Sequence, residues 1–184
     1  MVAMPITALA QGTGSPPTDR YRYPLPTYEE DWRWLQWVHH TDPWDLLKFV
    51  PLSVDGTTSL SLGGEGRVTY ERFGNPNFGL TPPDPNGYLL QRYLLHTDVR
   101  VGSHLRVWTE LNSSIENGRV GGPRPVIDED RLDPHQAFVD LTVGAAGASP
   151  AVLRAGRQEI ALGSGRMYAL REGPNVPLSS TASA

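Results

Sequence analysis

The sequence predicts an all-β protein of long antiparallel strands, each with one apolar and one polar face. Glycine and proline together supply 36 of the 184 residues (19 plus 17), which favours many turns and works against a helical bundle. Polar and apolar residues alternate with a period of two over five stretches, as in strands. Long loops and short turns separate these stretches alternately, which is typical of an up-and-down sheet.

The composition excludes several other classes. The apolar runs are too short for a membrane-spanning helix of about 20 residues, whereas a membrane β-barrel stays possible because its strands alternate. The net charge of −4 gives no support for nucleic-acid binding, and the absence of cysteine removes disulfides and thiolate chemistry. The cations are 15 arginines and one lysine. Biased codon usage explains this as well as a need for guanidinium groups that recognise carboxylate or phosphate.

The segments before the strands carry little chemistry. Residues 1–10 end in Ala-Leu-Ala, the small-x-small pattern cut by signal peptidase, and we interpret them as the remnant of a signal peptide. Residues 11–27 are rich in Gly, Pro, Ser and Thr and are predicted to be a disordered or extended linker. Residues 28–52 are predicted to be a tryptophan-rich periplasmic segment.

A short helix is predicted from Tyr28 to about His39. Three acidic residues at its start suit the positive end of a helix dipole. Trp34, Trp37 and Val38 fall at i, i+3 and i+4, so we expect them to share one face of this helix.

The first strand begins near Thr57 and has two distinct faces. Its even positions are apolar or small and its odd positions are polar, Glu65 and Arg67 among them. Residues 73–87, loaded with proline and glycine, form a long loop. The next strand runs from about Tyr88 to Val101. Its polar face carries Arg92, His96, Asp98 and Arg100, and its other face carries Tyr93, Leu95, Val99 and Val101.

Three further strands follow the short turn at Gly102-Ser103. The third, about His104 to Ser114, has Arg106 and Glu110 on its polar face. Residues 115–134 form a loop with an acidic cluster, expected to be solvated. The fourth strand is His135 to Val143. The fifth runs from Ala151 to about Ala161, and a sixth is possible after Gly163.

Two architectures fit this alternation: a soluble sandwich with its apolar faces packed together, or a membrane barrel with its apolar faces in lipid. The strands are longer than the usual 5 to 6 residues and match a tilted membrane span of about 9 to 11. Their polar faces place arginine beside glutamate or aspartate on successive strands, as expected of a wet lumen. We therefore predict an antiparallel up-and-down outer-membrane β-barrel, present as an incomplete portion of about five to six strands.

Several ordered motifs resemble the amino-terminal part of the alginate-export family of outer-membrane porins, from about residue 28 to residue 176. They are WDLLKFVPL at 44–52, LSLGGEGR at 60–67, DRLDPHQAFVDL at 130–141, LRAGRQEI at 153–160 and REGPNV at 171–176. The resemblance implies a large monomeric barrel whose cation-lined lumen passes a polyuronate. It assigns residues 57–176 to the first strands of that barrel.

The similarity ends near the carboxyl end of the chain. In the family, the REGPNV stretch leads into further strands, whereas here residues 177–184 read PLSSTASA and are predicted to be a disordered tail. Five or six strands cannot close a barrel, and an open edge in lipid leaves backbone groups unpaired. We therefore expect a truncated fragment.

The predicted substrate-binding residues are the charged residues of the polar faces, which would line the pore. They are Arg67, Arg92, Arg100, Arg106 and Arg154, with Glu65, Asp98 and Glu110 as their partners. A guanidinium binds a carboxylate through two parallel donors. An ordinary cross-strand pair is an equally good interpretation of any single arginine. Arg154 and Arg157 have opposite parity and cannot both face inward without a bulge.

No other motif supports catalysis or a cofactor. His39, His40 and Asp42 lack the spacing of a metal site, and the acidic cluster at 128–133 lacks that of a calcium loop. Trp32, Trp34, Trp37 and Trp44 suit packing, the membrane interface or sugar stacking.

We expect a non-enzymatic porin of the bacterial outer membrane that passes an anionic polysaccharide or small anions, without a cofactor. Its other partners would be membrane lipid and the barrel-assembly machinery, with no nucleic acid, and it would be monomeric when complete. The alternative is a soluble β-sandwich carbohydrate-binding module.

Overall fold

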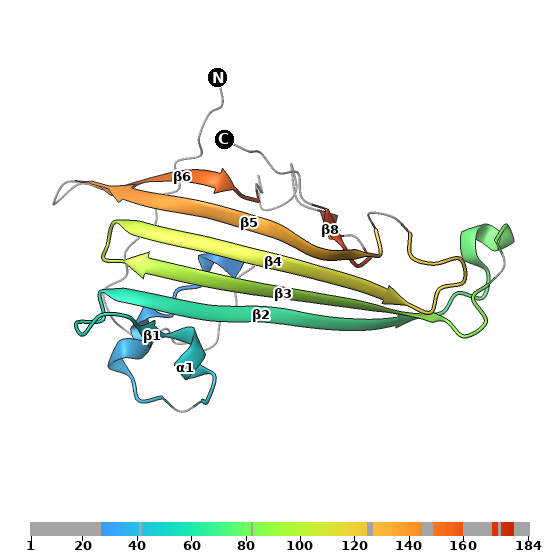
Figure 1. The fold of residues 1–184 in the computed structure, drawn as a ribbon, viewed down its shortest axis with the longest axis horizontal. Helices are drawn as coiled ribbons and strands as arrows, with labels where there is room; N and C mark the ends of the chain where they lie inside the picture. The colour runs from blue at the N-terminus through green and yellow to red at the C-terminus, as the bar shows by residue number, and fades with distance from the viewer. Residues whose placement is uncertain are drawn as a thin grey trace, which may run out of the picture. The chain divides into compact units, whose positions relative to one another are not determined.

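The structure, a computed structural model, describes residues 27–40, 42–81, 83–124, 127–144, 149–159, 171–172 and 174–178. Strands dominate these residues (Figure 1). The elements, in chain order, are the 3-10 helices η1 (Thr27–Glu29) and η2 (Arg33–Trp37), α1 (Asp45–Lys48), β1 (Val50–Pro51), β2 (Thr58–Glu71), the 3-10 helix η3 (Pro76–Gly79), β3 (Tyr88–Val101), β4 (Leu105–Asn117), β5 (Asp130–Val143), β6 (Ala151–Arg157), β7 (Arg171–Glu172) and β8 (Pro177–Leu178).

The main sheet has six strands in the order β1-β2-β3-β4-β5-β6, so each strand pairs with its neighbour along the chain. The direction of β2 to β5 alternates (Figure 1). β1 pairs antiparallel with β2, placing Val50 opposite Leu60. Among the described residues β1 and β6 lie at the two ends of this order. The predicted fold class, all-β with antiparallel up-and-down strands, is confirmed.

The chain divides into two compact units. The first comprises residues 1–63, 96–109 and 137–156, and the second comprises residues 64–95, 110–136 and 157–184. β2, β3, β4 and β5 each contribute residues to both units. The first unit contains the short turn between β3 and β4, where Gly102 adopts a φ of 59° and donates its backbone N–H to the carbonyl of Thr57. The second unit contains the two long connections, residues 72–87 and 118–129.

The predicted strands match β2 to β6 with shifts at their ends. β3 has the predicted bounds, whereas β4 extends to Asn117 and β6 ends at Arg157. The largest correction is β5, which begins at Asp130 rather than His135, so the predicted loop at 115–134 is shorter. A further strand was predicted after Gly163, but residues 160–170 lie outside the described part of the chain. β8 lies inside the predicted tail at residues 177–184, and it pairs with β7, which precedes that tail.

The predicted helix at 28–39 is wrong as a continuous α-helix, because the structure has the two short 3-10 helices η1 and η2 instead. The acidic residues between them bond locally rather than along a helix. Asp31 accepts hydrogen bonds from the backbone and the guanidinium of Arg33. Glu30 accepts one from Trp32 Nε1 at 2.8 Å. Such local side-chain bonds compete with helix formation.

The buried aromatic residues of this segment also differ from the prediction. Trp32, Leu35 and Phe49 form a buried apolar cluster, with Trp34 packed against it. Trp37, expected to share a face with Trp34, is 66% exposed, and Trp44 is exposed as well. Trp34 and Trp37 both lie in η2, but only Trp34 packs against the cluster, so the two do not form one buried face.

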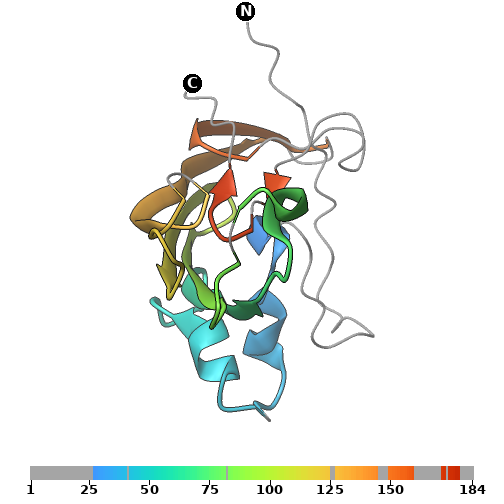
Figure 2. The same ribbon diagram turned by 90° about the vertical axis from the view of Figure 1, so that its right-hand side faces the viewer.

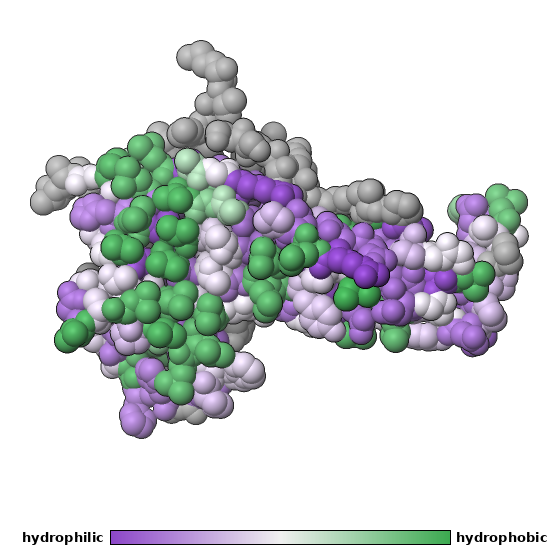
Figure 3. All heavy atoms as spheres, in the orientation of Figure 1, coloured by the Kyte–Doolittle hydropathy of each residue, from purple (hydrophilic) through white to green (hydrophobic). Residues whose placement is uncertain are grey.

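The main sheet buries its polar face and exposes its apolar face, which is the reverse of a sheet in a soluble protein. The alternation predicted for β3, β4 and β5 is confirmed, and it is the polar face that is buried. The other face exposes aliphatic side chains, including Leu95 at 65% and Leu153 at 49%. Figure 3 shows apolar residues in green gathered over the end of the strands near the β3–β4 turn, where Val101 and Leu105 lie. In the described part of the chain, no second layer covers this face as a sandwich requires.

Candidate functional site on the polar face

The polar face of the sheet carries a dense set of buried charged and amide side chains. They alternate with exposed residues and therefore share one face of each strand. They are Arg92, His96 and Asp98 on β3, Glu110, Asn112 and Ser114 on β4, and Gln136 and Asp140 on β5. Buried charges need partners to offset their lost hydration, and the strands supply these partners to one another.

In the first unit, Asp98 binds two of the predicted arginines. Its carboxylate accepts hydrogen bonds from Arg106 Nε at 2.7 Å and from Arg100 Nε at 3.0 Å. Asp140 on β5 accepts two hydrogen bonds from Arg154 on β6, at 2.6 and 2.8 Å, and lies 3.9 Å from Arg106. Positive and negative groups thus alternate across the four strands β3 to β6. Asp140 was placed on the polar face by its parity but not among the predicted site residues.

Aromatic rings lie beneath these charges. His96 stacks on Trp108 with 4.7 Å between ring centroids, and Trp108 stacks on Phe138 at 6.3 Å. The Arg154 guanidinium lies 3.8 Å from the Phe138 centroid, and the Arg106 guanidinium lies 5.2 Å from that of Trp108. A guanidinium on an aromatic face keeps a fixed orientation.

Residues 27–37 cover part of this face. Arg106 Nη2 donates to the carbonyl of Tyr28 at 2.7 Å, and Arg100 Nη2 donates to the carbonyl of Glu30 at 3.1 Å. The Tyr28 ring packs edge-on against Phe138 at 5.8 Å. Figure 1 views the opposite, apolar face, and the first described residues, in dark blue, pass behind β3 and β4; Figure 2 shows the same blue ribbon on the inner side of these strands.

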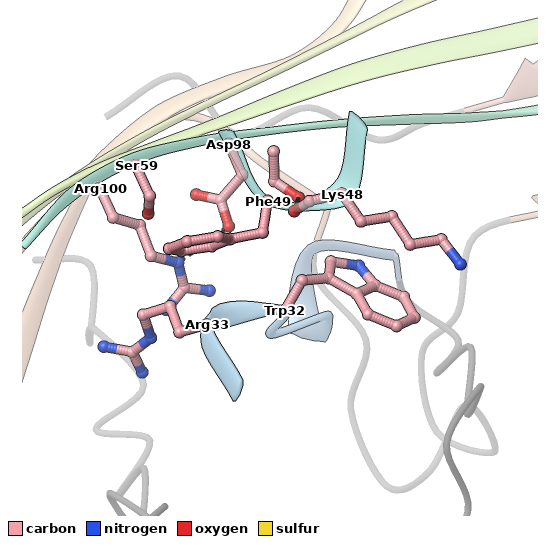
Figure 4. A pocket seen from close by; sticks show the side chains of 8 residues that line it. Trp32, Arg33, Lys48, Phe49, Ser59, Asp98 and Arg100 are labelled. Carbon is pink, nitrogen blue, oxygen red and sulfur yellow. Dashed lines mark hydrogen bonds and ion pairs between the residues drawn. The ribbon is translucent and has the colours of Figure 1, made fainter. Parts of the chain in front are cut away.

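A small pocket lies where this segment meets the sheet (Figure 4). Its lining includes Trp32, Arg33, Phe49, Asp98 and Arg100. Its volume of about 10 Å³ is near the lower limit for one water molecule, so it has no room for a sugar.

The second unit has its own polar cluster. Arg92 on β3 donates to Glu65 on β2 at 3.2 Å, so one of the predicted arginines pairs with one of the acidic residues expected as partners. Gln136 on β5 donates its side-chain amide to Glu110 at 3.1 Å. Arg67 donates to the carbonyl of Pro174 at 2.6 Å.

Asn175 joins three parts of the second unit. Its side-chain Nδ2 lies 3.2 Å from the carbonyl oxygen of Gln91 on β3, 3.1 Å from that of Ile115 on β4 and 2.7 Å from that of Asp128, two residues before β5. Asn175 is fully buried, and Ser114 donates to its carbonyl. Periodicity gave no signal for this residue, since it lies outside any alternating stretch.

β6 carries the two arginines of opposite parity, Arg154 and Arg157, and both of them lie against carboxylates. Arg154 pairs with Asp140 in the first unit, and Arg157 pairs with Asp133 at 3.0 Å in the second. Between them Gly156 has a φ of 130°, a value that L-residues rarely adopt. The regular alternation is therefore broken at Gly156, which resolves the conflict of parity.

The acidic cluster at 128–133 is not the solvated loop that the sequence predicted. The carboxylate of Asp128 is fully buried and accepts hydrogen bonds from the backbone N–H and the guanidinium of Arg124 at 2.7 to 2.9 Å. Arg119 lies 3.1 Å from the same carboxylate. Burial opposes ionisation of Asp128, but these donors and charges outweigh it and hold its pKa below the usual range.

The described residues contain no cluster of three or more His, Asp or Glu side chains able to hold a metal ion, and His39, His40 and Asp42 form none. None of the described helices is long and apolar enough to cross a membrane.

Comparison with known proteins adds a family to this geometry. The family model described as alginate export matches residues 58–183, which is more than half of the chain. No curated protein and no solved structure matches. The match covers β2 to β8 and every residue of the predicted pore lining. The chain belongs to the alginate export family.

Proposed function

We propose that this chain forms part of the wall of an outer-membrane pore that passes an anionic polysaccharide of the alginate type, or small anions. The observation that carries the proposal is the inversion of the sheet. Charged residues such as Asp98 and Arg92 are 3 to 4% exposed, while aliphatic residues such as Leu95 face outward at 65%. Lipid on the apolar face and water on the polar face give each surface a compatible neighbour.

The polar face suits a polymer that bears one carboxylate on each sugar. Such a chain needs cations along its path to offset lost hydration, but binding must stay weak enough for it to move on. Arg67, Arg92, Arg100, Arg106 and Arg154 supply the guanidinium groups. Glu65, Asp98 and Asp140 hold several of them in place and reduce their net attraction for the substrate.

The remaining partners follow from the same assignment. The exposed aliphatic residues would contact outer-membrane lipid after insertion by the barrel-assembly machinery. In a closed monomeric wall, β1 and β6 at the ends of the strand order would each pair with a further strand rather than with one another, because a free strand edge in hydrocarbon leaves its backbone groups unpaired.

The test uses the whole chain folded in detergent micelles. A short oligouronate is titrated into the protein in a calorimeter, and its carboxyl-reduced, neutral counterpart serves as the control ligand. We expect only the acidic ligand to bind, and its affinity to fall as salt rises, because screening weakens exposed charge pairs. Arg67→Glu should weaken binding about tenfold, close to the loss of one charged hydrogen bond.

Arg131→Glu is the matched control, since Arg131 is 82% exposed and pairs with Glu129 rather than with the polar face. It should bind like the wild type. Equal binding of the acidic and neutral ligands would contradict the proposal. A protein that stays soluble and monomeric without detergent, and does not float with lipid vesicles, would instead support the β-sandwich carbohydrate-binding module.

A further inference from the structure

The segment at residues 27–37 covers the same arginines that the proposed function assigns to the substrate. Arg100 and Arg106 donate to the carbonyls of Glu30 and Tyr28, and the Arg154 guanidinium lies 4.7 Å from the centroid of the Tyr28 ring. Three of the five predicted substrate arginines therefore already contact this segment of the same chain.

The segment is also anionic. Glu29, Glu30 and Asp31 stand against one cation, Arg33, over residues 29–33. Glu30 is buried, and its carboxylate lies 3.8 Å from Nε2 of His96. Asp31 lies 3.6 Å from Arg100 Nη1. The segment thus presents to the polar face what a polyuronate presents, namely carboxylates and neutral oxygen acceptors.

Asp31 keeps its charge over a wide range of pH. Its partial burial opposes ionisation, but the hydrogen bonds from Arg33 and the charges of Arg100 and Arg33 outweigh this effect and hold the pKa of Asp31 below its ordinary value. The carboxylate therefore stays available to Arg100 wherever a uronate is ionised as well.

Two different kinds of contact hold the segment. Its polar contacts reach Arg100 and Arg106, whereas its apolar anchor is the cluster of Trp32 and Leu35 with Phe49, which lies outside the strands. Loss of the polar contacts alone would release Arg100 and Arg106, while the cluster and the Tyr28 ring on Phe138 and Arg154 still tether the segment.

We propose that residues 28–31 act as an internal competitor that occupies Arg100 and Arg106 until an anionic polysaccharide displaces it. The inference rests on the proposed function, because it concerns the regulation of the same arginines. It assigns Glu30 and Asp31, the acidic residues of this segment that contact the polar face, a role in setting the affinity for substrate rather than in forming the sheet.

The experiment compares two substitutions that each remove one negative charge from the segment. Asp31→Asn removes the ion pairs with Arg100 and Arg33 and should raise the affinity for the short oligouronate about threefold, which is the size of a partly exposed ion pair. Glu29→Gln is the matched control, because Glu29 is exposed. It should leave the affinity unchanged.

A second measurement follows the segment itself. The chain has no cysteine, so Glu29→Cys gives a single site for a nitroxide spin label. The oligouronate should increase the mobility of this label, and the neutral carboxyl-reduced ligand should not. Binding to Asp31→Asn alone, with none to the wild type, would also support competition.

The outcomes separate this inference from the proposed function. If the oligouronate binds, the two variants have equal affinities and the label keeps its mobility, the competitor is refuted and the pore assignment stands. If the oligouronate binds neither the wild type nor Asp31→Asn, both are refuted.

Discussion

At the scale of single residues, Gly63 on β2 makes room for His96. A Cβ atom added to Gly63 would lie 2.3 Å from His96 Nε2 and 2.7 Å from Cε1. The imidazole has little freedom to move aside, since it is buried and stacked on Trp108. The absence of a side chain at this position is therefore a requirement of the polar face.

Gly63→Ala should lower the free energy of unfolding by about 1 to 3 kcal/mol, because it overpacks a buried contact. Gly66→Ala on the same strand is the matched control, since its Cβ would meet only Tyr93 at 3.7 Å. Urea unfolding in detergent, followed by tryptophan fluorescence, measures both. Equal stability of the two variants would show that His96 does not constrain Gly63.

Asp128 is the second residue with a clear energetic consequence. Its folded-state pKa lies below the unfolded value of about 3.9, because the donors from Arg124 and the charge of Arg119 overcome the cost of burial. The stability it contributes is therefore fully present above about pH 4 and is lost as the pH falls through the folded pKa.

Asp128→Asn should cost about 2 to 3 kcal/mol at neutral pH, since it weakens charged hydrogen bonds to a buried carboxylate. The difference between wild type and variant should shrink as the pH falls below about 4. Urea midpoints measured over a series of pH values test this. Glu129→Gln, which removes the partner of the exposed Arg131, should show a much smaller effect. A difference that does not depend on pH would contradict the assigned ionisation.

At the scale of elements, the strands were predictable and the turns between them less so. The period of two fixed the bounds of β3 and the faces of β3, β4 and β5, because each strand has a single chemical contrast along its length. The start of β5 was missed because acidic residues such as Asp130 and Asp133 are more common in loops than in strands. The ion pair of Asp133 with Arg157 on β6, which offsets this preference, is not visible in the sequence. The helix at 28–39 was predicted wrongly because its acids bond to near neighbours.

Two exposed residues of β5 give a direct test of what surrounds the apolar face of the sheet. Val139 is exposed on the apolar face well inside β5, and Leu132 is exposed near its beginning. An arginine on a lipid face costs about 2 to 4 kcal/mol near the bilayer midplane and about 0 to 1 near its surface. Val139→Arg should therefore reduce folding into lipid vesicles far more than Leu132→Arg, as measured by urea titration of vesicle-bound protein. Equal losses would argue against a membrane around this face.

At the scale of the whole molecule, the sequence predicted the charged residues of the polar face better than it predicted the segments that pack on that face. The pairs of Asp98 with Arg106 and of Glu65 with Arg92 join neighbouring strands with matching faces, and Asp98 and Arg100 lie two residues apart on one face of β3. The contacts of Tyr28, Glu30 and Asn175 could not be foreseen, because they join segments far apart in the chain and depend on how the backbone turns.

Asn175 has one further consequence. Its single amide group is matched to three carbonyl oxygens that come from β3, β4 and the approach to β5. The amide has two N–H donors, and the three carbonyl oxygens around it leave neither donor without an acceptor. Asn175 thus holds together three segments that are far apart in the sequence, and its complete burial depends on their meeting in one place.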